Sequence, residues 1–536
     1  MRCPAKCWVV FVLVAAAALA IRLPRLTARP MHGDEAVNAV KFGQLLEEGF
    51  YRYDPHEYHG PTLNYFTLIA AWLGSAEKLA QVGEFTLRIV PVFFGVLLVL
   101  MLLLLVDGLG KWTVIFAAAL TAVSPAMVFY SRYYIHETLL VCFTFGVIVS
   151  GYRYAQTKCL TWAILTGLFT GLAYTTKETC IIAFASMVLA VLLTLIVFRR
   201  PRHNGGGEPA VNIRHIIAAA ATAIIISVLF YSSFFTNSSG VLDSVRAYGT
   251  YLNRATQDPL HIHPWYYYLK MLIYSRYGAG PVWSEGLIIV LAGTGFVVAM
   301  KAKSSQNNNV RLLRFFAFYT LVSTVIYSAI GYKTPWSMLT FLHGMIVLAA
   351  IGATGLIQLC PNLLSRRVLG LIFIFGLFHL TWQAYQANYT FSSDQRNPYV
   401  YAHTTNDIFQ IAERVEQIAQ VHPDRYSMHI EVICPNNDYW PLPWYLRRFN
   451  RVGWYSKVDD SAPIAPLIIA SPAVEAALGR KIYEVAPQGE RNLYVPLFDT
   501  CLELRPTVEI TGFVTKDLRD KFQAINDDST DQRPIP

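Results

Sequence analysis

The chain has 536 residues, of which 54% are hydrophobic and only 15% are charged. This charged fraction is well below the quarter that is typical of soluble globular proteins. The composition therefore excludes an ordinary soluble enzyme and a disordered chain, and it predicts a membrane protein. The formal net charge of +9 comes from basic residues that cluster between apolar runs. That distribution is typical of membrane orientation and does not indicate nucleic-acid binding.

Eleven apolar runs approach the length of about 20 residues that a helix needs to cross a bilayer core. They predict a polytopic α-helical membrane protein with about eleven transmembrane helices. The predicted spans are residues 7–23, 86–106, 112–130, 135–151, 160–176, 179–198, 215–235, 284–300, 312–330, 336–359 and 367–386. The first run also resembles a cleavable signal peptide, but the membrane character of the remaining chain favours an uncleaved anchor.

Segment 61–74 is apolar, but it is short and begins with a proline. If this segment does not cross the bilayer, every short basic loop falls on the same side, which the positive-inside rule makes cytoplasmic. We therefore interpret it as an interfacial or re-entrant helix on the outer face. The same assignment places the loops 24–85 and 236–283, and everything after about residue 387, outside the cytoplasm. It predicts a multi-pass protein of the cell (inner) membrane with an extracytoplasmic active site.

The last part of the chain changes character after residue 386. TNDIFQIAERVEQIAQ has helical spacing, whereas YSMHIEVIC and PLIIAS are typical of short strands. We expect a transmembrane catalytic domain over 1–386 and an extracytoplasmic α/β domain over 387–536. The eight cysteines form no CxxC pair, which indicates neither a zinc site nor a disulfide framework. Whether Cys434 and Cys501 pair stays open.

Ionisable residues gather in the segments assigned to the outer face. Asp34 and Glu35 begin a predicted amphipathic helix, where adjacent carboxylates also suit capping and the helix dipole. Lys177 and Lys333 alone would be ordinary interfacial anchors. The convergence of many such residues on one face favours a substrate site, because ionisable groups at membrane depth are costly. The others are His59, Arg132, His136, Glu137, Glu178, His261 and His263.

The order of several short motifs resembles a known superfamily. These motifs are Asp34-Glu35 after the first span, Gly60-Pro61, EFTLRIVP with Arg88, Ser124-Pro125 followed by Arg132, GLAYTTKE, and GYKTPW with Lys333 and Trp336. The chain is similar to the GT-C membrane glycosyltransferases, in the style of the protein O-mannosyltransferases and the lipid A aminoarabinose transferases. It is most similar to the prokaryotic flippase-activity-associated membrane proteins, whose YKTPW and WPLPWYLRRF motifs stand here at 332–336 and 440–449.

The resemblance implies an enzyme that moves a hexosyl or pentosyl group from a polyprenyl-phosphate donor to an acceptor hydroxyl. The acceptor would be a lipid-linked, protein or glycan molecule on the extracytoplasmic face. Asp34 corresponds to the acidic residue that acts at the acceptor hydroxyl, and Glu35 is the second expected catalytic residue. A carboxylate can take the hydroxyl proton while cations hold the departing phosphate. The expected substrate-binding residues are His59, Arg88, Arg132, His136, Glu137, Lys177, Glu178, His261, His263, Lys333 and Trp336.

Cations alone can neutralise the leaving phosphate, so this reasoning requires no cofactor. A divalent metal ion stays an open alternative, because the outer segments also hold side chains that can ligate one. These are His32, Asp34, His56, His59, His261 and His263. Two other functions stay open as well, a transporter of lipids or lipid-linked glycans and a non-catalytic scaffold for glycan assembly. The unusual charges on one face, without a recognisable inverted repeat, argue against the transporter.

Overall fold

The computed structural model describes residues 5–56, 59–197, 212–257, 261–303, 309–485 and 491–531. The chain forms two compact units. Unit 1 consists of Met1–Leu26, Gln44–Glu77 and Gly83–Tyr401, and unit 2 consists of Thr27–Gly43, Lys78–Val82 and Ala402–Pro536. These packing units differ from the predicted division at residue 386, because two short segments of the loop 24–85 pack with the tail of the chain. The domain boundary itself stays a prediction.

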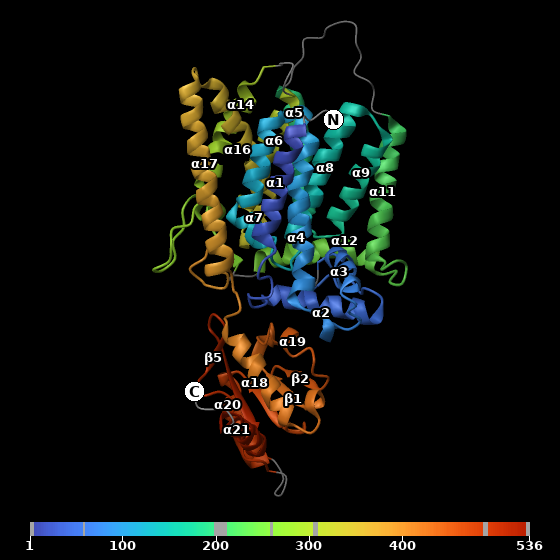
Figure 1. The fold of residues 1–536 in the computed structure, drawn as a ribbon. Coiled ribbons are helices and arrows are strands. Elements are labelled where there is room, and N and C mark those ends of the chain that lie inside the picture. The colour runs from blue at the N-terminus through green and yellow to red at the C-terminus, as the bar shows by residue number, and fades with distance from the viewer. Residues whose placement is uncertain are drawn as a thin grey trace. The chain divides into compact units, whose positions relative to one another are not determined.

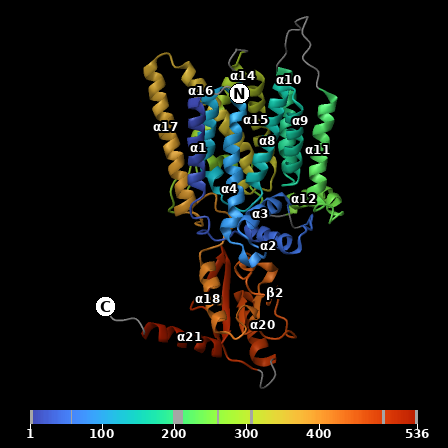
Figure 2. The ribbon, with the colours of Figure 1, turned by 45° about the vertical axis from the view of Figure 1, so that its right-hand side comes forward.

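Unit 1 is a helical bundle, with α11 and α17 at opposite edges (Figures 1 and 2). The α-helices that lie wholly in this unit are α1 (Ala5–Arg22), α3 (Thr62–Leu73), α4 (Glu84–Met101), α5 (Val106–Leu109), α6 (Lys111–Val123), α7 (Pro125–Tyr130), α8 (Glu137–Thr157), α9 (Leu160–Tyr174), α10 (Cys180–Val197), α11 (Ile213–Tyr231), α12 (Gly240–Gln257), α13 (Tyr267–Ile273), α14 (Gly286–Lys301), α15 (Val310–Ala329), α16 (Leu339–Leu359) and α17 (Leu363–Tyr385). Helix α2 (Gly33–Glu48) belongs to unit 2 up to Gly43.

Seven helical stretches in the described part of the chain are long and apolar enough to cross a membrane by length and composition. They are Glu84–Leu109, Glu137–Thr157, Cys180–Val197, Ile213–Tyr231, Val310–Ala329, Pro335–Leu359 and Leu363–Thr390. The other four predicted spans correspond to shorter apolar helices, Trp8–Arg22, Lys111–Val123, Leu160–Tyr174 and Gly286–Lys301. The multi-pass membrane class is confirmed, whereas the count of eleven stays a prediction.

Glycines allow two helix pairs of the bundle to approach closely. A Cβ atom on Gly295 of α14 would lie 1.9 Å from the carbonyl oxygen of Leu348 in α16. A Cβ atom on Gly167 of α9 would lie 2.1 Å from the carbonyl oxygen of Ala219 in α11. Small residues at such contacts bring two backbones together and increase van der Waals packing where lipid provides no hydrophobic driving force.

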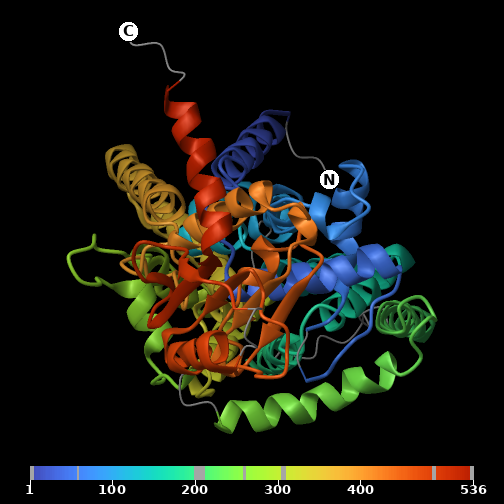
Figure 3. The same cartoon turned by 90° about the horizontal axis from the view of Figure 1, so that it is seen from below.

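The predicted interfacial segment 61–74 forms α3, whose 12 residues span about 18 Å at 1.5 Å per residue. This length is well short of a bilayer core of about 30 Å, so α3 cannot cross alone. Helix α12 lies across one end of the bundle, at its rim (Figures 1 and 3). Its Ser244 and Ala247 are buried, whereas Leu242 and Val245 on the opposite face are exposed.

Unit 2 is an α/β domain, and the predicted α/β character of the tail is confirmed. Its six-stranded sheet has the order β2-β1-β3-β6-β4, with β5 also paired to β6. The pairs β1/β2 and β1/β3 are parallel, and the pairs of β6 with β3, β4 and β5 are antiparallel. The strands are β1 (Ile430–Ile433), β2 (Val452–Tyr455), β3 (Leu467–Ala470), β4 (Tyr494–Pro496), β5 (Leu502–Arg505) and β6 (Val508–Thr515).

The helices of the tail are α18 (Asp407–Val421), α19 (Leu442–Tyr445), α20 (Glu475–Arg480) and α21 (Lys516–Asp531). The predicted helix TNDIFQIAERVEQIAQ is α18, and the two predicted strands contain β1 and β3. In α18, Ile408, Ile411, Val415 and Ile418 recur every three or four residues and are all buried. They join the strand residues in one hydrophobic core, which fixes α18 against the sheet.

Candidate functional site

The Gly60-Pro61-Thr62 motif packs tightly against the turn after α9. The Thr62 hydroxyl lies 2.7 Å from both the carbonyl oxygen and the hydroxyl oxygen of Thr175. The backbone N–H of Thr62 donates to the same carbonyl oxygen at 3.2 Å. A Cβ atom on Gly60 would lie 2.1 Å from that oxygen, so only glycine fits here. This joint brings His59 close to Glu178.

His59, His136 and Glu178 form a polar cluster at this joint, in which His136 and Glu178 are buried and His59 is partly exposed. His59 Nδ1 lies 2.9 Å from Glu178 Oε2, and the Tyr53 hydroxyl donates to Glu178 Oε1 at 3.0 Å. Burial acts to raise the pKa of Glu178, but the charge and hydrogen bond of His59 outweigh it and lower this pKa. Burial, His59 and Lys177 lower the pKa of His136 well below its ordinary value. Neutral His136 then donates from Nε2 to the Gly60 carbonyl oxygen at 3.1 Å.

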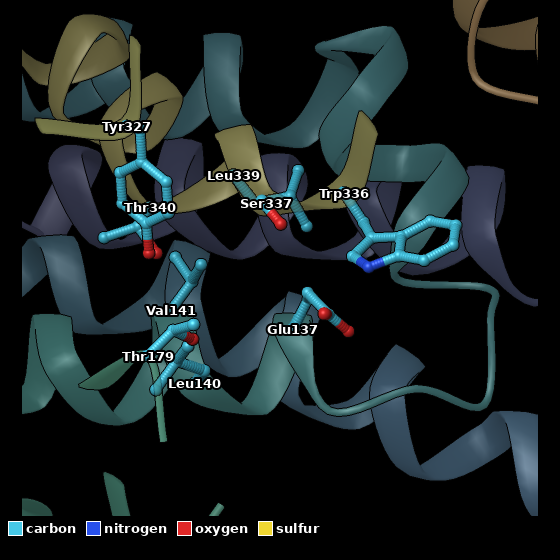
Figure 4. Close-up of a pocket in the computed structure, with 9 residues that line it drawn as sticks. All are labelled: Glu137, Leu140, Val141, Thr179, Tyr327, Trp336, Ser337, Leu339 and Thr340. Carbon is cyan, nitrogen blue, oxygen red and sulfur yellow. The ribbon is translucent and has the colours of Figure 1, made fainter. Parts of the chain in front are cut away.

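Lys177 forms a short ion pair with Glu137, the first residue of α8. Glu137 also lines a small pocket. Figure 4 shows the Glu137 carboxylate and the Trp336 ring on this pocket, with Thr179 among the other lining residues. The pocket thus combines an aromatic ring, hydroxyl groups and a carboxylate that is paired with a cation.

Lys333 lies where two loops pair. Ile262 and Tyr332 form an antiparallel bridge, in which the Lys333 N–H donates to the His261 carbonyl oxygen at 2.9 Å. Lys333 Nζ donates to the His263 carbonyl oxygen at 3.1 Å and to a second carbonyl oxygen, that of Ile330. The aromatic residues of this pairing form a cluster, which consists of His261, His263, Tyr267, Tyr332, Trp336 and Tyr401.

Arg132 and Arg88 lie at the end of α1. Arg132 Nη1 donates to the Arg22 carbonyl oxygen at 2.6 Å, and Nη2 donates to that of Arg25 at 3.4 Å. Arg88 Nη1 donates to the Leu26 carbonyl oxygen at 2.6 Å. The last carbonyl groups of a helix lack intrahelical partners, so Arg132 stabilises the C-terminus of α1 through the Arg22 carbonyl. Arg88 instead binds the segment that follows the helix. The side chains of Arg22, Arg88 and Arg132 are all buried.

Asp34 and Glu35 belong to unit 2 and have different environments. Glu35 is fully buried, accepts a hydrogen bond from the His32 N–H at 3.0 Å and pairs with Arg29 at 3.5 Å. The Asp34 side chain is 57% exposed and lies 4.0 Å from His32 Nδ1. Glu35 therefore has the contacts of a helix-capping residue, while Asp34 can reach a molecule in solution.

The tail of the chain holds the segment that contains Asp34. The Thr404 hydroxyl donates to the Met31 carbonyl oxygen at 2.7 Å, and the Met31 N–H donates to the Tyr445 hydroxyl at 2.9 Å. The His32 and His403 rings stack with their centroids 5.7 Å apart. Tyr445 lies in the WPLPWYLRRF motif, so this motif contacts the segment that leads into α2.

Glu285 is a buried acidic residue that the sequence analysis missed. Its carboxylate accepts hydrogen bonds from the Ser124 hydroxyl at 2.5 Å, the Ala126 N–H at 3.0 Å and the Tyr399 hydroxyl at 2.9 Å. Burial raises the pKa of Glu285. A lone carboxylate at the start of the predicted span 284–300 is the sequence feature that could have identified it. The contacts assign Glu285 to the packing of α7, because Ala126 lies in the first turn of this helix.

No group of three or more His, Cys, Asp or Glu side chains in the described part of the chain has an arrangement that could hold a metal ion. The potential ligands lie in separate clusters, with His59 beside Glu178 and His261 beside Tyr401. His56 is exposed on its loop. Cys434 and Cys501, whose pairing the sequence left open, are both free thiols.

The structure gathers the expected substrate-binding residues into three groups within unit 1. The first is His59, His136, Glu137, Lys177 and Glu178; the second is His261, His263, Lys333 and Trp336; and the third is Arg88 and Arg132. The pocket joins the first two groups, because Glu137 and Trp336 both line it. The two expected catalytic residues, Asp34 and Glu35, belong to unit 2.

Comparisons with known proteins agree on the fold. A family model described as dolichyl-phosphate-mannose-protein mannosyltransferase matches residues 65–242. The solved structure of apo ArnT from Cupriavidus metallidurans is 14% identical, with a TM-score of 0.62 over 95% of this chain and 98% of ArnT. The same protein bound to undecaprenyl phosphate is 15% identical, with a TM-score of 0.61 and the same coverage.

A third solved structure is the apo oligosaccharyltransferase from Archaeoglobus fulgidus. It is 13% identical to this chain, with a TM-score of 0.54 over 84% of this chain and 64% of the oligosaccharyltransferase. No curated protein matches the chain in sequence. The chain therefore has the ArnT-like GT-C fold, and the predicted fold class is confirmed.

Proposed function

We propose that this protein is an integral-membrane glycosyltransferase that moves a sugar from a polyprenyl-phosphate carrier to an acceptor hydroxyl. The observation that carries the proposal is the exposed carboxylate of Asp34 beside the buried carboxylate of Glu35. Asp34 stands where the GT-C resemblance expects the acidic residue that acts on the acceptor. The mannosyltransferase match and the likeness to an ArnT structure that contains undecaprenyl phosphate support this reaction class.

The proposed reaction forms one bond and breaks one. The acceptor oxygen attacks the anomeric carbon, the bond from that carbon to the phosphate oxygen breaks, and its electron pair stays on the phosphate. Asp34 takes the proton of the acceptor hydroxyl. General-base catalysis of this kind contributes roughly two to four orders of magnitude to a rate. The exposure of Asp34 suits this role, because the carboxylate must contact an incoming molecule.

Glu35 is better suited to positioning Asp34 than to touching the substrate. Its carboxylate is engaged by the His32 N–H and by Arg29 at the start of α2. These contacts satisfy a helix N–H group and orient the first turn, which carries Asp34. We therefore assign Glu35 as a positioning residue and Asp34 as the catalytic base.

We propose Lys177 and Lys333 as ligands of the donor phosphate, and Glu137 and Trp336 as contacts of the donor sugar. Both lysines are buried, so a phosphate that reached them would interact in a medium of low dielectric constant. Trp336 supplies an aromatic face on the pocket. His59, His136, Glu178, His261 and His263 would support these contacts.

The site would face the extracytoplasmic side of the cell (inner) membrane. This orientation rests on the basic loops between the spans, which the positive-inside rule assigns to the cytoplasm. A transporter or a non-catalytic scaffold is less well supported, because the solved structures named above, which resemble this chain, are those of transferases. A scaffold would also be insensitive to the loss of the Asp34 carboxylate.

Mass spectrometry of glycolipids and glycoproteins from cells that lack the protein tests the proposal. We expect a sugar to be missing from one class of glycoconjugate and to return with the wild-type protein. Asp34→Asn should not restore it. Asp424→Asn is a matched control, because Asp424 is exposed in unit 2 and its N–H contacts His422 Nδ1 at 3.0 Å, as that of Asp34 contacts His32 Nδ1. An unchanged set of glycoconjugates in the deletion strain would contradict the proposal.

A further inference from the structure

Unit 2 carries a group of aromatic rings that the proposed reaction does not yet use. It consists of Tyr439, Trp440 and Trp454, and we call it the aromatic platform. The Tyr439 ring lies 4.9 Å from the Trp454 ring and 6.1 Å from the Trp440 ring, measured between centroids. All three residues are only partly buried.

The fold holds these rings in fixed positions. Trp454 lies on β2, the edge strand that pairs with β1 in parallel register. After β1, the chain turns through Asn436 and Asn437, whose φ angles of 57° and 59° lie in the left-handed region that asparagine tolerates. Tyr439 follows this turn and packs partly against the hydrophobic core of the sheet, as does Trp454.

The platform adjoins the start of α2 within the same unit. A Cβ atom on Gly33 would lie 4.0 Å from the Cβ atom of Trp440. Gly33 directly precedes Asp34, so the backbone beside Trp440 carries the proposed base. The contacts of Thr404 and Tyr445 with Met31 hold this segment on the tail. Trp440 therefore lies beside the backbone that leads into Asp34.

Polar residues directly precede the platform in the chain. Asn436 and Asn437 are exposed, and Asp438 pairs with Arg505 at 2.8 Å. A patch that enters the bilayer would have an apolar rim, because desolvating amides and charges is costly. A sugar ring has the matching composition, with C–H faces that stack on aromatic rings and hydroxyl groups that bond to a polar rim.

We propose that the aromatic platform binds the acceptor, and that the acceptor is a carbohydrate. In this arrangement the acceptor sugar stacks on Trp440 and Trp454 and presents one hydroxyl to Asp34. This inference rests on the proposed function, since it names the acceptor of that reaction. It also assigns specificity for the acceptor to the WPLPWYLRRF motif, which begins at Trp440.

Binding of defined trisaccharides to the full-length protein in nanodiscs tests this inference without turnover or donor. The probes are α-mannotriose, chitotriose and cellotriose, and the readout is titration calorimetry. We expect at least one probe to bind, and Trp440→Ala and Trp454→Ala to weaken it by about tenfold, or ~1.4 kcal/mol. Trp440→Phe should restore part of the affinity, because it keeps an aromatic face.

Two controls keep the result specific. Trp265→Ala removes a tryptophan that is 65% exposed in unit 1, and it should leave binding unchanged. A Ser- and Thr-rich peptide should not compete with the bound trisaccharide. The inference is overturned if none of the three probes binds, if the Trp440 and Trp454 variants bind like the wild type, or if the peptide competes.

The glycoconjugate analysis of the deletion strain is a separate measurement. Platform-dependent binding together with unchanged glycoconjugates would contradict the proposed function and leave a carbohydrate-binding surface. A missing sugar together with platform-independent binding would contradict only the acceptor assignment.

Discussion

His59 Nδ1 lies 2.9 Å from Glu178 Oε2, although 119 positions separate the two residues in the sequence. The pair joins the loop before α3 to the turn between α9 and α10. It also orders the residues next to it, since Gly60 packs on Thr175 and Lys177 pairs with Glu137. The joint thus fixes one wall of the region to which we assign the donor.

His59→Ala should destabilise the protein by about 1–3 kcal/mol, because it leaves the buried Glu178 carboxylate without its strongest partner. The pKa of Glu178 should rise, since burial then acts without the opposing charge of His59. Thermal unfolding of the purified protein measures the loss. In the His59→Ala background, Glu178→Gln should recover part of the lost stability. If the effects of the two substitutions simply add, His59 and Glu178 are not coupled, which would contradict this prediction.

Gly60→Ala should lower the unfolding temperature strongly, because its Cβ atom would lie 2.1 Å from a backbone oxygen that cannot move aside. Overpacking of this kind costs about 1–3 kcal/mol or more. Gly83→Ala is the matched control, since a Cβ atom there has no atom within 4 Å. Equal unfolding temperatures for the two variants would show that the contact with Thr175 does not restrict Gly60.

The lowered pKa of His136 predicts that the stability of the protein depends on pH. Its pKa in the folded protein is well below the ordinary histidine value, so the unfolded chain takes up a proton that the folded protein does not. The contribution of His136 to the free energy of unfolding is complete above about pH 6.5 and is lost as the pH falls below that value. His136→Gln should flatten the stability profile between about pH 6.5 and 5, because it removes this titrating group. A profile as steep as that of the wild type would contradict the assignment.

Arg132→Lys should destabilise the protein by about 1–3 kcal/mol, because a lysine cannot donate to the Arg22 and Arg25 carbonyl oxygens in the same fork. The sequence alone suggested a phosphate ligand at this position. The carbonyl contacts account for the arginine without a phosphate, so we expect the rate of sugar transfer per folded molecule to stay close to that of the wild type. A large fall in that rate at saturating donor would instead support the phosphate contact.

Apolar runs and strand patterns predicted the parts of the fold that depend on local sequence. The runs at 86–106 and 336–359 became long helices, and the periodicity of TNDIFQIAERVEQIAQ became α18, since burial of one face follows from residue spacing. The predicted class of the tail was correct for the same reason. The number of crossings is harder to predict, because three of the apolar runs form helices of only 13 to 16 residues.

Contacts between distant segments could not be predicted in this way. The Met31 N–H meets the Tyr445 hydroxyl across 414 positions, so no sequence window contains both. Asp34 and Glu35 are equivalent in the sequence, but one is exposed and the other is buried, which depends on the packing around α2. Glu285 looked like an ordinary residue at the start of an apolar run. Its three hydrogen-bond donors come from segments more than 100 positions away.

The most direct test of the account is the rate of sugar transfer from a synthetic polyprenyl-phosphate sugar by purified wild-type protein and Asp34→Asn. The sugar and the acceptor come from the glycoconjugate that the deletion strain lacks, and Asp424→Asn is the control. Because the amide cannot take the acceptor proton, we predict that Asp34→Asn lowers the rate by roughly two to four orders of magnitude, with donor binding kept. Transfer by Asp34→Asn at the wild-type rate would contradict the central claim that Asp34 is the base of a glycosyltransferase.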